Sequence, residues 1–146
     1  MRRFCVLTIQ CLAFLLLSNV PSFAADPETS QRLPALVETT VESTLDGEKQ
    51  AVLYWAPEAA SQKKTPLLVF LHSWSGDYKQ DNSKWQKEAV KRGWIFLHPD
   101  FRGANNAPKA CGSKFARQDI LDAMAFAESQ FRIDSTRVYL AGISGG

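Results

Sequence analysis

The sequence has few of the residues that bind metal ions or form disulfides. It contains only two histidines, His72 and His98, and neither has an acidic or cysteine cluster nearby at the spacing of metal ligands. We therefore expect no metal site and no cofactor. Of its three cysteines, Cys5 and Cys11 fall in an N-terminal apolar segment, which leaves Cys111 alone. In an oxidising compartment, an odd cysteine indicates a missing partner or a free thiol.

The sequence also lacks an excess of either charge and any long hydrophobic run. Arg2 and Arg3 account for the small basic excess, because without them 15 basic residues face 15 acidic ones. This balance gives no support for a nucleic-acid partner or for binding to an anionic membrane surface. The longest apolar run, residues 4–17, is shorter than the ~20 residues that a membrane-spanning helix needs.

Residues 1–24 have the pattern of a secretory signal peptide. A basic start is followed by the apolar run and then by the small residues of a cleavage site at positions 22–24. An uncleaved membrane anchor is the alternative, and the shortness of the run argues against it. We therefore expect an exported protein, secreted or periplasmic, with no membrane contact after cleavage of the signal.

The rest of the chain predicts a single domain after a short leading segment. Residues 25–35 contain Pro27 and Pro34 and are expected to form a loose lead-in to the fold. Residues 36–146 show no repeat, no low-complexity tract and no linker. They are numerous enough to bury a hydrophobic core, and nothing in them indicates an oligomeric state.

Five segments have strand character, and the first two form a hairpin. They are short runs rich in β-branched, aromatic or other apolar residues, at positions 36–44, 50–55, 66–72, 94–98 and 137–141. Asp46 and Gly47 between the first two runs are a strong hairpin signal. The run at 66–72 is apolar throughout, as is typical of a strand buried on both faces of a parallel sheet.

Two segments have the spacing of helices. Residues 83–92 carry apolar side chains at helical spacing, with Ser83 as the expected cap and Gly93 as the expected end. Residues 113–131 follow the same rule, with Ser113 as the cap. The order is hairpin, strand, helix, strand, helix, strand. It predicts an α/β fold with a mostly parallel sheet, an N-terminal β-hairpin and helices on both faces.

The last five residues, Gly142-Ile143-Ser144-Gly145-Gly146, match the G-x-S-x-G pattern of a nucleophile elbow. In that motif, a sharp turn after a strand exposes a serine hydroxyl above the sheet. A loop without chemistry is the alternative. The helix and strand expected immediately before the motif favour the elbow.

Together with two further stretches, the elbow resembles the α/β-hydrolase superfamily. More narrowly, residues 66–76, 100–103 and 134–146 are similar to prolyl-oligopeptidase-like (peptidase family S9) serine hydrolases and to related exported esterases. The resemblance implies that Ser144 is the nucleophile of an acyl transfer and that the Gly145 N–H stabilises the oxyanion. A second oxyanion donor is implied in the loop after residues 66–72, at Trp74 or Ser73.

The chain departs from these families at two positions of that loop. Ser73 follows His72, whereas esterase loops often read His-Gly-Gly, and a serine there would be strained if the position required a positive φ. Trp74 stands where prolyl oligopeptidases tend to have a tyrosine. The second departure favours an esterase over a strict peptidase.

The acid and the base of a catalytic triad are not recognisable downstream of Ser144. In α/β-hydrolases they follow the serine in the order acid, then histidine. We therefore expect residues 36–146 to be the N-terminal part of a catalytic domain, truncated at the nucleophile and inactive alone. The alternative order His72, Asp100, Ser144 belongs to antiparallel β-barrel proteases, which the strand-helix alternation argues against.

The remaining polar residues have structural interpretations. His72 is expected to shape the oxyanion loop through a hydrogen bond, and Asp100 and Arg102 to form a local ion pair. Asp119 and Asp122 are expected on the exposed side of a helix. Two functions remain open: a serine hydrolase acting on a small-molecule ester or peptide, or a non-catalytic binding protein with the α/β-hydrolase fold.

Overall fold

The computed structural model describes residues 32–146. The expected signal peptide, residues 1–24, lies outside this range, as does most of the leading segment. Residues 32–36 have no regular secondary structure and lead into the first strand. Within the described range, no helix combines the length and the apolar character needed to cross a bilayer.

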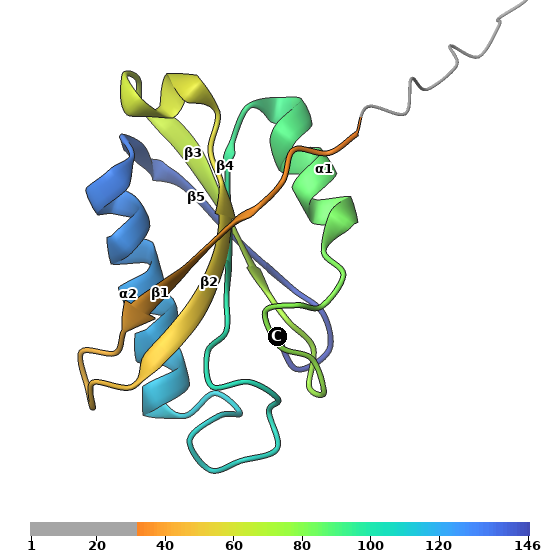
Figure 1. The fold of residues 1–146 in the computed structure, drawn as a ribbon, viewed down its shortest axis with the longest axis vertical. Coiled ribbons are helices and arrows are strands. Elements are labelled where there is room, and N and C mark those ends of the chain that lie inside the picture. Colours follow the sequence, from red (N-terminus) through yellow and green to blue (C-terminus); the bar gives the residue numbers. More distant parts are fainter. Residues whose placement is uncertain (1–31) are drawn as a thin grey trace, which may run out of the picture. The chain divides into compact units, whose positions relative to one another are not determined.

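The core of the fold is a five-stranded sheet (Figure 1). Its strands are β1 (Val37–Glu42), β2 (Lys49–Trp55), β3 (Thr65–Leu71), β4 (Ile95–Pro99) and β5 (Ile133–Gly142). They lie in the order β1-β2-β4-β3-β5. The neighbours β4, β3 and β5 are parallel, whereas β2 pairs antiparallel with both β1 and β4. This confirms the predicted α/β class, a parallel group of strands extended by an N-terminal hairpin.

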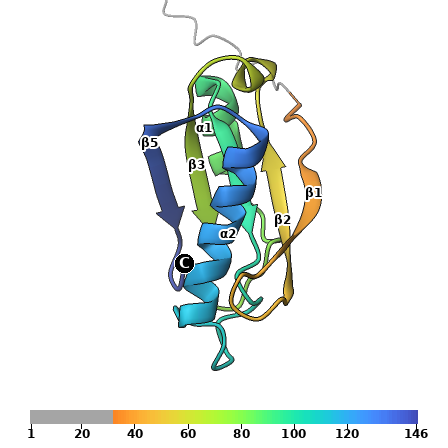
Figure 2. The same ribbon diagram turned by 90° about the vertical axis from the view of Figure 1, so that its left-hand side faces the viewer.

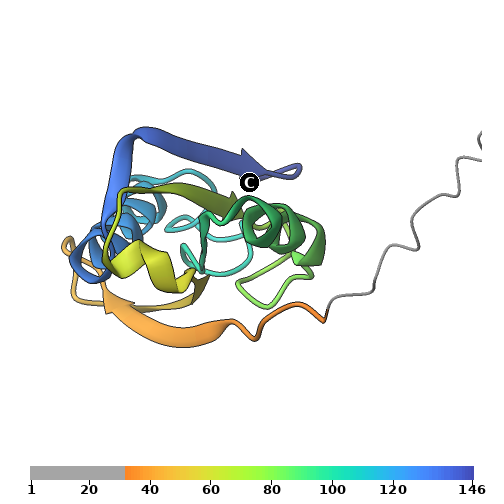
Figure 3. The ribbon, with the colours of Figure 1, turned by 90° about the horizontal axis from the view of Figure 1, so that it is seen from above.

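One helix covers each face of the sheet. They are α1 (Ser83–Arg92) and α2 (Lys114–Gln130), and a short 3₁₀ helix, η1 (Glu58–Ser61), precedes β3. With the sheet seen face-on, α2 lies in front of the strands and α1 behind them (Figure 2), and the view from above also places the two helices on opposite sides of the sheet (Figure 3). Right-handed strand–helix–strand connections place successive helices in this way.

Strand β3 supplies both halves of the core because its side chains alternate between the two faces. Leu67, Val69 and Leu71 join the cluster beneath α2. Leu68 and Phe70 join the cluster beneath α1. All seven residues of β3 are buried, as the continuous apolar run predicts. Each buried side chain of this size contributes roughly 1.5–3 kcal/mol of transfer free energy.

The two predicted helix caps have different outcomes. The Ser113 hydroxyl accepts a hydrogen bond from the Ala116 N–H (3.2 Å), so the prediction for α2 is confirmed. Ser83 is already the first residue of α1, and the cap position belongs to Asn82. The Ser83 N–H donates to the Asp81 carboxylate (3.0 Å). The prediction of a Ser83 cap is therefore wrong. The helix already includes Ser83, and the Asp81 carboxylate accepts the N–H at its start.

Strand β5 begins earlier than the sequence predicts. Ile133 already pairs with Thr65, whereas the sequence predicts a strand only from residue 137. The register between β3 and β5 shifts just after this pair, which accommodates the polar residues. Asp134 accepts a hydrogen bond from the Thr136 N–H (3.1 Å) within the irregular stretch. Asp134 and Thr136 thus make a hydrogen bond typical of a turn, but strand β5 continues through these residues.

The carboxyl ends of β4, β3 and β5 meet at one edge of the sheet. Leu71, the last residue of β3, lies opposite Gly142, the last residue of β5. The loop that begins at His72 therefore emerges beside the turn that contains Ser144. The loop at residues 100–113, which follows β4, lies at the same end of the molecule (Figure 1). Ligands bind at this edge in open α/β sheets.

Candidate active site

The segment after β5 has the geometry of a strained, exposed turn. Ser144 adopts a left-handed backbone conformation with φ 57°, which is uncommon for a residue other than glycine, and its side chain is exposed. The Gly146 N–H donates to the Ile143 carbonyl (3.0 Å), which closes the turn. Strain of this kind costs about 1–3 kcal/mol and is typical of functional sites.

The glycines of this turn allow the backbone to pass very close to the loop after β3. A Cβ atom on Gly146 would collide with the carbonyl oxygens of Leu71 and His72. A Cβ atom on Gly145 would lie 3.1 Å from both the backbone nitrogen and the Cα of Trp74. Contacts this close explain why residues without side chains follow Ser144. They also place the Gly145 and Trp74 backbones side by side.

Two amide groups at this contact are free to bind an anion. Among the described residues, neither the Gly145 N–H nor the Trp74 N–H donates to another group. The Ser73 N–H, by contrast, donates to Gln80 Oε1 (2.8 Å), as does the Ser73 hydroxyl (2.8 Å). Of the two residues proposed for the second oxyanion donor, the geometry therefore favours Trp74. Ser73 is not among the left-handed residues, so it carries no strain.

His72 is the buried residue that holds the loop after β3, which contains Ser73 and Trp74. Its side chain is fully buried, and Nδ1 donates to the Ser73 carbonyl (3.0 Å). The ring stacks on Phe101 with a centroid separation of 4.0 Å and an interplanar angle of 7°. Its Nε2 faces Asp100 Oδ1 at 3.8 Å, too far for a hydrogen bond. Burial raises the pKa of Asp100. These contacts match the structural role expected for His72.

The second histidine, His98, is buried as a neutral group. The Asn82 side-chain amide donates to its Nδ1 (2.5 Å), and the ring packs edge-on against Phe70. Burial, with a smaller contribution from His72, lowers the pKa of His98 to about 4. A group held neutral in this way makes the stability of the protein depend on pH.

We expect the free energy of unfolding to fall as the pH drops from about 6.5 to about 4. In the unfolded chain His98 titrates near its ordinary pKa of 6.5, so only the unfolded state gains a proton in this window. The full difference is about 3 kcal/mol. Urea unfolding at pH 7.5 and 5.0 should show about 2 kcal/mol of it, because pH 5.0 lies above the folded-state pKa. A His98→Gln variant should lose less stability between these two values than the wild type does. Equal losses would contradict the prediction.

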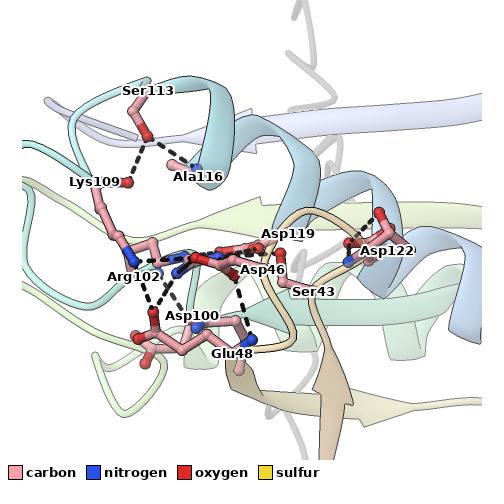
Figure 4. Close-up of polar contacts among 12 residues, drawn as sticks. Ser43, Asp46, Glu48, Asp100, Arg102, Lys109, Ser113, Ala116, Asp119 and Asp122 are labelled. Atoms are coloured by element: carbon pink, nitrogen blue, oxygen red, sulfur yellow. Dashed lines mark hydrogen bonds and ion pairs between the residues drawn. The ribbon is translucent and has the colours of Figure 1, made fainter.

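Arg102 forms the largest ion-pair network of the described residues, and it does not involve Asp100. The buried guanidinium contacts Asp46 (2.8 Å), Asp119 (2.5 Å) and Glu48, and it also donates to the Ser43 hydroxyl (Figure 4). These partners raise the pKa of Arg102, and Arg102 in turn lowers the pKa of Asp46. The predicted pair between Asp100 and Arg102 is wrong, because Arg102 points to the hairpin turn and α2.

Two aspartates of α2 are buried rather than solvated. Asp119 receives hydrogen bonds from Arg102, and Asp122 receives one from the Thr44 N–H (2.8 Å). The expectation that both lie on an exposed helix face is wrong. The turn between β1 and β2 folds over this side of α2 and supplies a covering partner that helical spacing alone does not reveal (Figure 4).

Asn105 is a site residue that sequence reasoning missed. It lies in the loop after β4, is 1% exposed, and hydrogen-bonds to three other residues, two of them on other loops. Its backbone N–H donates to the Trp74 carbonyl (2.7 Å), and its Nδ2 donates to the Gly145 carbonyl (3.2 Å). Its Oδ1 accepts from the Cys111 N–H (3.0 Å). No spacing motif marks this residue. The only signal is its place six residues after the carboxyl-terminal end of β4.

The described residues contain neither a disulfide nor a metal-binding cluster. Cys111 is exposed, unpaired within residues 32–146 and left-handed at φ 49°. In the same range, no group of three or more histidine, cysteine, aspartate and glutamate side chains is arranged to hold a metal ion.

Comparison with solved structures shows which class of fold this is. A thermostable esterase superposes with a TM-score of 0.61 at 16% identity, covering 78% of this chain and 36% of its own. Esterase Est22 with p-nitrophenol gives 0.58 at 20% identity, covering 77% and 36%. A fungal esterase from Rhizomucor miehei gives 0.56 at 21% identity, covering 83% and 39%. The described residues thus form part of an α/β-hydrolase fold, as the resemblance implied.

One curated relative is similar in sequence, and no protein-family model matches. It is the bifunctional acetylxylan esterase/xylanase XynS20E of Neocallimastix patriciarum, 31% identical over 86 residues. The match covers 56% of this chain and 12% of the relative. The chain therefore spans about an eighth of that relative and little more than a third of the esterase structures. None of these proteins supports the narrower likeness to prolyl oligopeptidases, which stays a prediction.

Proposed function

We propose that this chain is part of an exported serine esterase, with Ser144 as the nucleophile. The single observation that carries the proposal is the left-handed, exposed Ser144 at the carboxyl end of a parallel strand. The Gly145 amide follows it and lies against the Trp74 amide. A nucleophile needs both exposure and adjacent N–H donors that bind the oxyanion.

The mechanism would be acyl transfer in two steps. Ser144 Oγ attacks the ester carbonyl carbon and passes its proton to the triad histidine. The carbonyl oxygen becomes an oxyanion, which accepts hydrogen bonds from the N–H groups of Gly145 and Trp74. The alcohol leaves with the proton from the histidine, and water then attacks the acyl group on Ser144 in the same way. Each oxyanion donor contributes about 2.7–4 kcal/mol to the transition state.

The acid and the histidine of this mechanism must come from elsewhere in the protein. Both histidines of the sequence lie upstream of Ser144, and both are fully buried among other side chains. In α/β-hydrolases the acid and the histidine follow the serine. We therefore infer that the gene product continues beyond Gly146 and supplies them, and we call it the full-length protein below. Export is proposed from residues 1–24 alone.

The proposed substrate class is a small carboxylic ester rather than a peptide. The similar solved structures are esterases, and the curated relative is named an acetylxylan esterase. Trp74 replaces the tyrosine expected in a prolyl-oligopeptidase-like peptidase. An ester releases an alcohol and a peptide releases an amine. The alcohol departs more readily, so ester hydrolysis needs less protonation of the leaving group than peptide hydrolysis does.

Hydrolysis of p-nitrophenyl acetate tests the proposal. We expect chain 1–146 to hydrolyse it no faster than its own Ser144→Ala variant does, because within residues 32–146 no proton acceptor is hydrogen-bonded to the Ser144 hydroxyl. The full-length protein should hydrolyse it in a Ser144-dependent way, and should cleave glycyl-prolyl-p-nitroanilide far more slowly. Ser144-dependent activity in chain 1–146, or preference for the peptide substrate, would contradict the proposal. A full-length protein with neither activity would favour a non-catalytic binding role.

A further inference from the structure

The described site contains one buried residue that hydrogen-bonds to both residues proposed as oxyanion donors. Asn105 is bonded to Trp74 through its backbone N–H (2.7 Å) and to Gly145 through its side chain (3.2 Å). Trp74 and Gly145 are 71 residues apart in sequence and lie on different loops. Their backbones lie close together, since a Cβ atom on Gly145 would lie 3.1 Å from the Trp74 backbone, but they do not hydrogen-bond to each other. Asn105 is the polar link between them.

We propose that Asn105 is a positioning residue that fixes the separation and orientation of the two oxyanion donors; this inference rests on the function proposed above. The N–H of Trp74 and the N–H of Gly145 must point to one oxygen atom at about 2.7–3.1 Å each. The carbonyl groups of the same two residues are the atoms that Asn105 holds. Fixing a carbonyl limits rotation of the adjacent peptide units, including those that carry the N–H groups.

The orientation of the Asn105 amide is itself determined by a third contact. The Cys111 N–H can only donate, so the atom of Asn105 that faces it must be Oδ1. Nδ2 is therefore the end that faces the Gly145 carbonyl, which can only accept. In the three contacts, the Asn105 backbone N–H and Nδ2 donate and Oδ1 accepts. Neither aspartate nor leucine could reproduce this set.

The loop that carries Asn105 is anchored on a rigid part of the fold. Arg102, three residues earlier, is clamped by the hairpin turn and by α2. Phe101 stacks on His72, which in turn holds the Ser73 carbonyl. These contacts hold the loop in place, so Asn105 can hold Trp74 and Gly145 in fixed positions. An asparagine on a mobile loop could not do so.

Kinetics of Asn105 variants in the full-length protein test the proposal. Asn105→Asp keeps the acceptor for Cys111 but places a carboxylate oxygen against the Gly145 carbonyl. We expect kcat for p-nitrophenyl acetate to fall about 10–100-fold in this variant, with KM changed less than about threefold. The affinity for a phenylboronic acid, which forms a tetrahedral adduct on Ser144, should fall by a similar factor. We expect the same changes in kcat, KM and boronate affinity for Asn105→Ala as for Asn105→Asp.

The matched control is Asn106→Ala. Asn106 is the same residue type in the same loop, but it is exposed and its side chain makes no hydrogen bond with residues 32–146. Its kcat, KM and boronate affinity should equal those of the wild type. Folded Asn105→Asp protein with wild-type kcat and boronate affinity would overturn the proposal. A rise in KM of about 10–100-fold without loss of kcat would also overturn it, since that result indicates a role in substrate binding.

A measurement on the wild type covers the case in which both Asn105 variants unfold. We expect boronate binding to slow amide hydrogen exchange in residues 104–106 together with residues 73–75 and 144–146. If the first segment does not respond while the other two do, the proposal fails. Failure of the proposed function looks different. In that case, boronate would protect none of the three segments, and hydrolysis by the wild type would not depend on Ser144.

Discussion

Replacing Ser144 with alanine in the full-length protein is expected to lower kcat/KM for p-nitrophenyl acetate by at least about 10³-fold. Removal of the nucleophile eliminates the covalent pathway, and comparable losses in serine hydrolases reach about 10⁶-fold. Some rate above that of water should remain, because the amides of Gly145 and Trp74 can still stabilise an oxyanion formed by direct attack of water. Initial rates over a range of substrate concentrations measure the effect.

Ser135→Ala is the matched control for this prediction. Ser135 is exposed, and its hydroxyl makes no hydrogen bond with another residue in the range 32–146. It lies in the irregular first part of β5, far along the strand from the turn. This variant should retain wild-type kcat/KM. A loss of activity in both variants would point to damage to β5 and not to loss of a nucleophile.

Replacing Arg102 with methionine is expected to lower the free energy of unfolding by about 3–5 kcal/mol. The Arg102 side chain is 3% exposed, and its partner Asp119 is 0% exposed, so the variant would leave a buried carboxylate without a cation. The hairpin turn would also lose its attachment to α2 through Asp46. Urea unfolding of wild type and variant at neutral pH measures the difference.

Two further variants identify the cause of that loss. Arg137→Met removes an exposed pair with Asp134, and we expect it to change the free energy of unfolding by less than about 1 kcal/mol. The double variant Arg102→Met/Asp119→Leu removes both members of the buried pair and should recover much of the lost stability. A single Arg102→Met variant as stable as Arg137→Met would contradict the account of the network.

The strands and helices could be predicted wherever their signals are local. The continuous apolar run of residues 66–72 anticipates β3 within one residue, and the spacing of residues 83–92 gives the bounds of α1. The Ser113 cap was found because its hydroxyl bonds to the amide three residues later. In each case the residues that determine the structure are neighbours in sequence.

Apart from the Ser83 cap and the start of β5, the errors concern residues whose partners are distant in sequence. Arg102 and Asp46 are 56 residues apart, and Thr44 and Asp122 are 78 apart. Helical spacing places Asp119 and Asp122 away from the apolar stripe of α2, and only the three-dimensional structure shows that the hairpin turn covers that side. Asn105 was missed for the same reason, because two of its three partners, Trp74 and Gly145, lie on other loops.

The candidate site was only partly accessible from the sequence. The motif identified Ser144 and Gly145, and the order of strands placed them beside the loop that contains Trp74. The choice between Ser73 and Trp74 required the structure, because Gln80 accepts the Ser73 N–H from a position seven residues downstream. No local rule predicts that an amide in a loop is already occupied.

Covalent labelling of the full-length protein tests the central claim most directly. A fluorophosphonate probe reacts with an activated serine hydroxyl and leaves a stable phosphonyl group on it. After tryptic digestion and tandem mass spectrometry, we expect the probe on Ser144, in the peptide that begins at Val138, and on no other serine. Absence of labelling in folded protein, or labelling at Ser73 in place of Ser144, would contradict the assignment of Ser144 as the nucleophile.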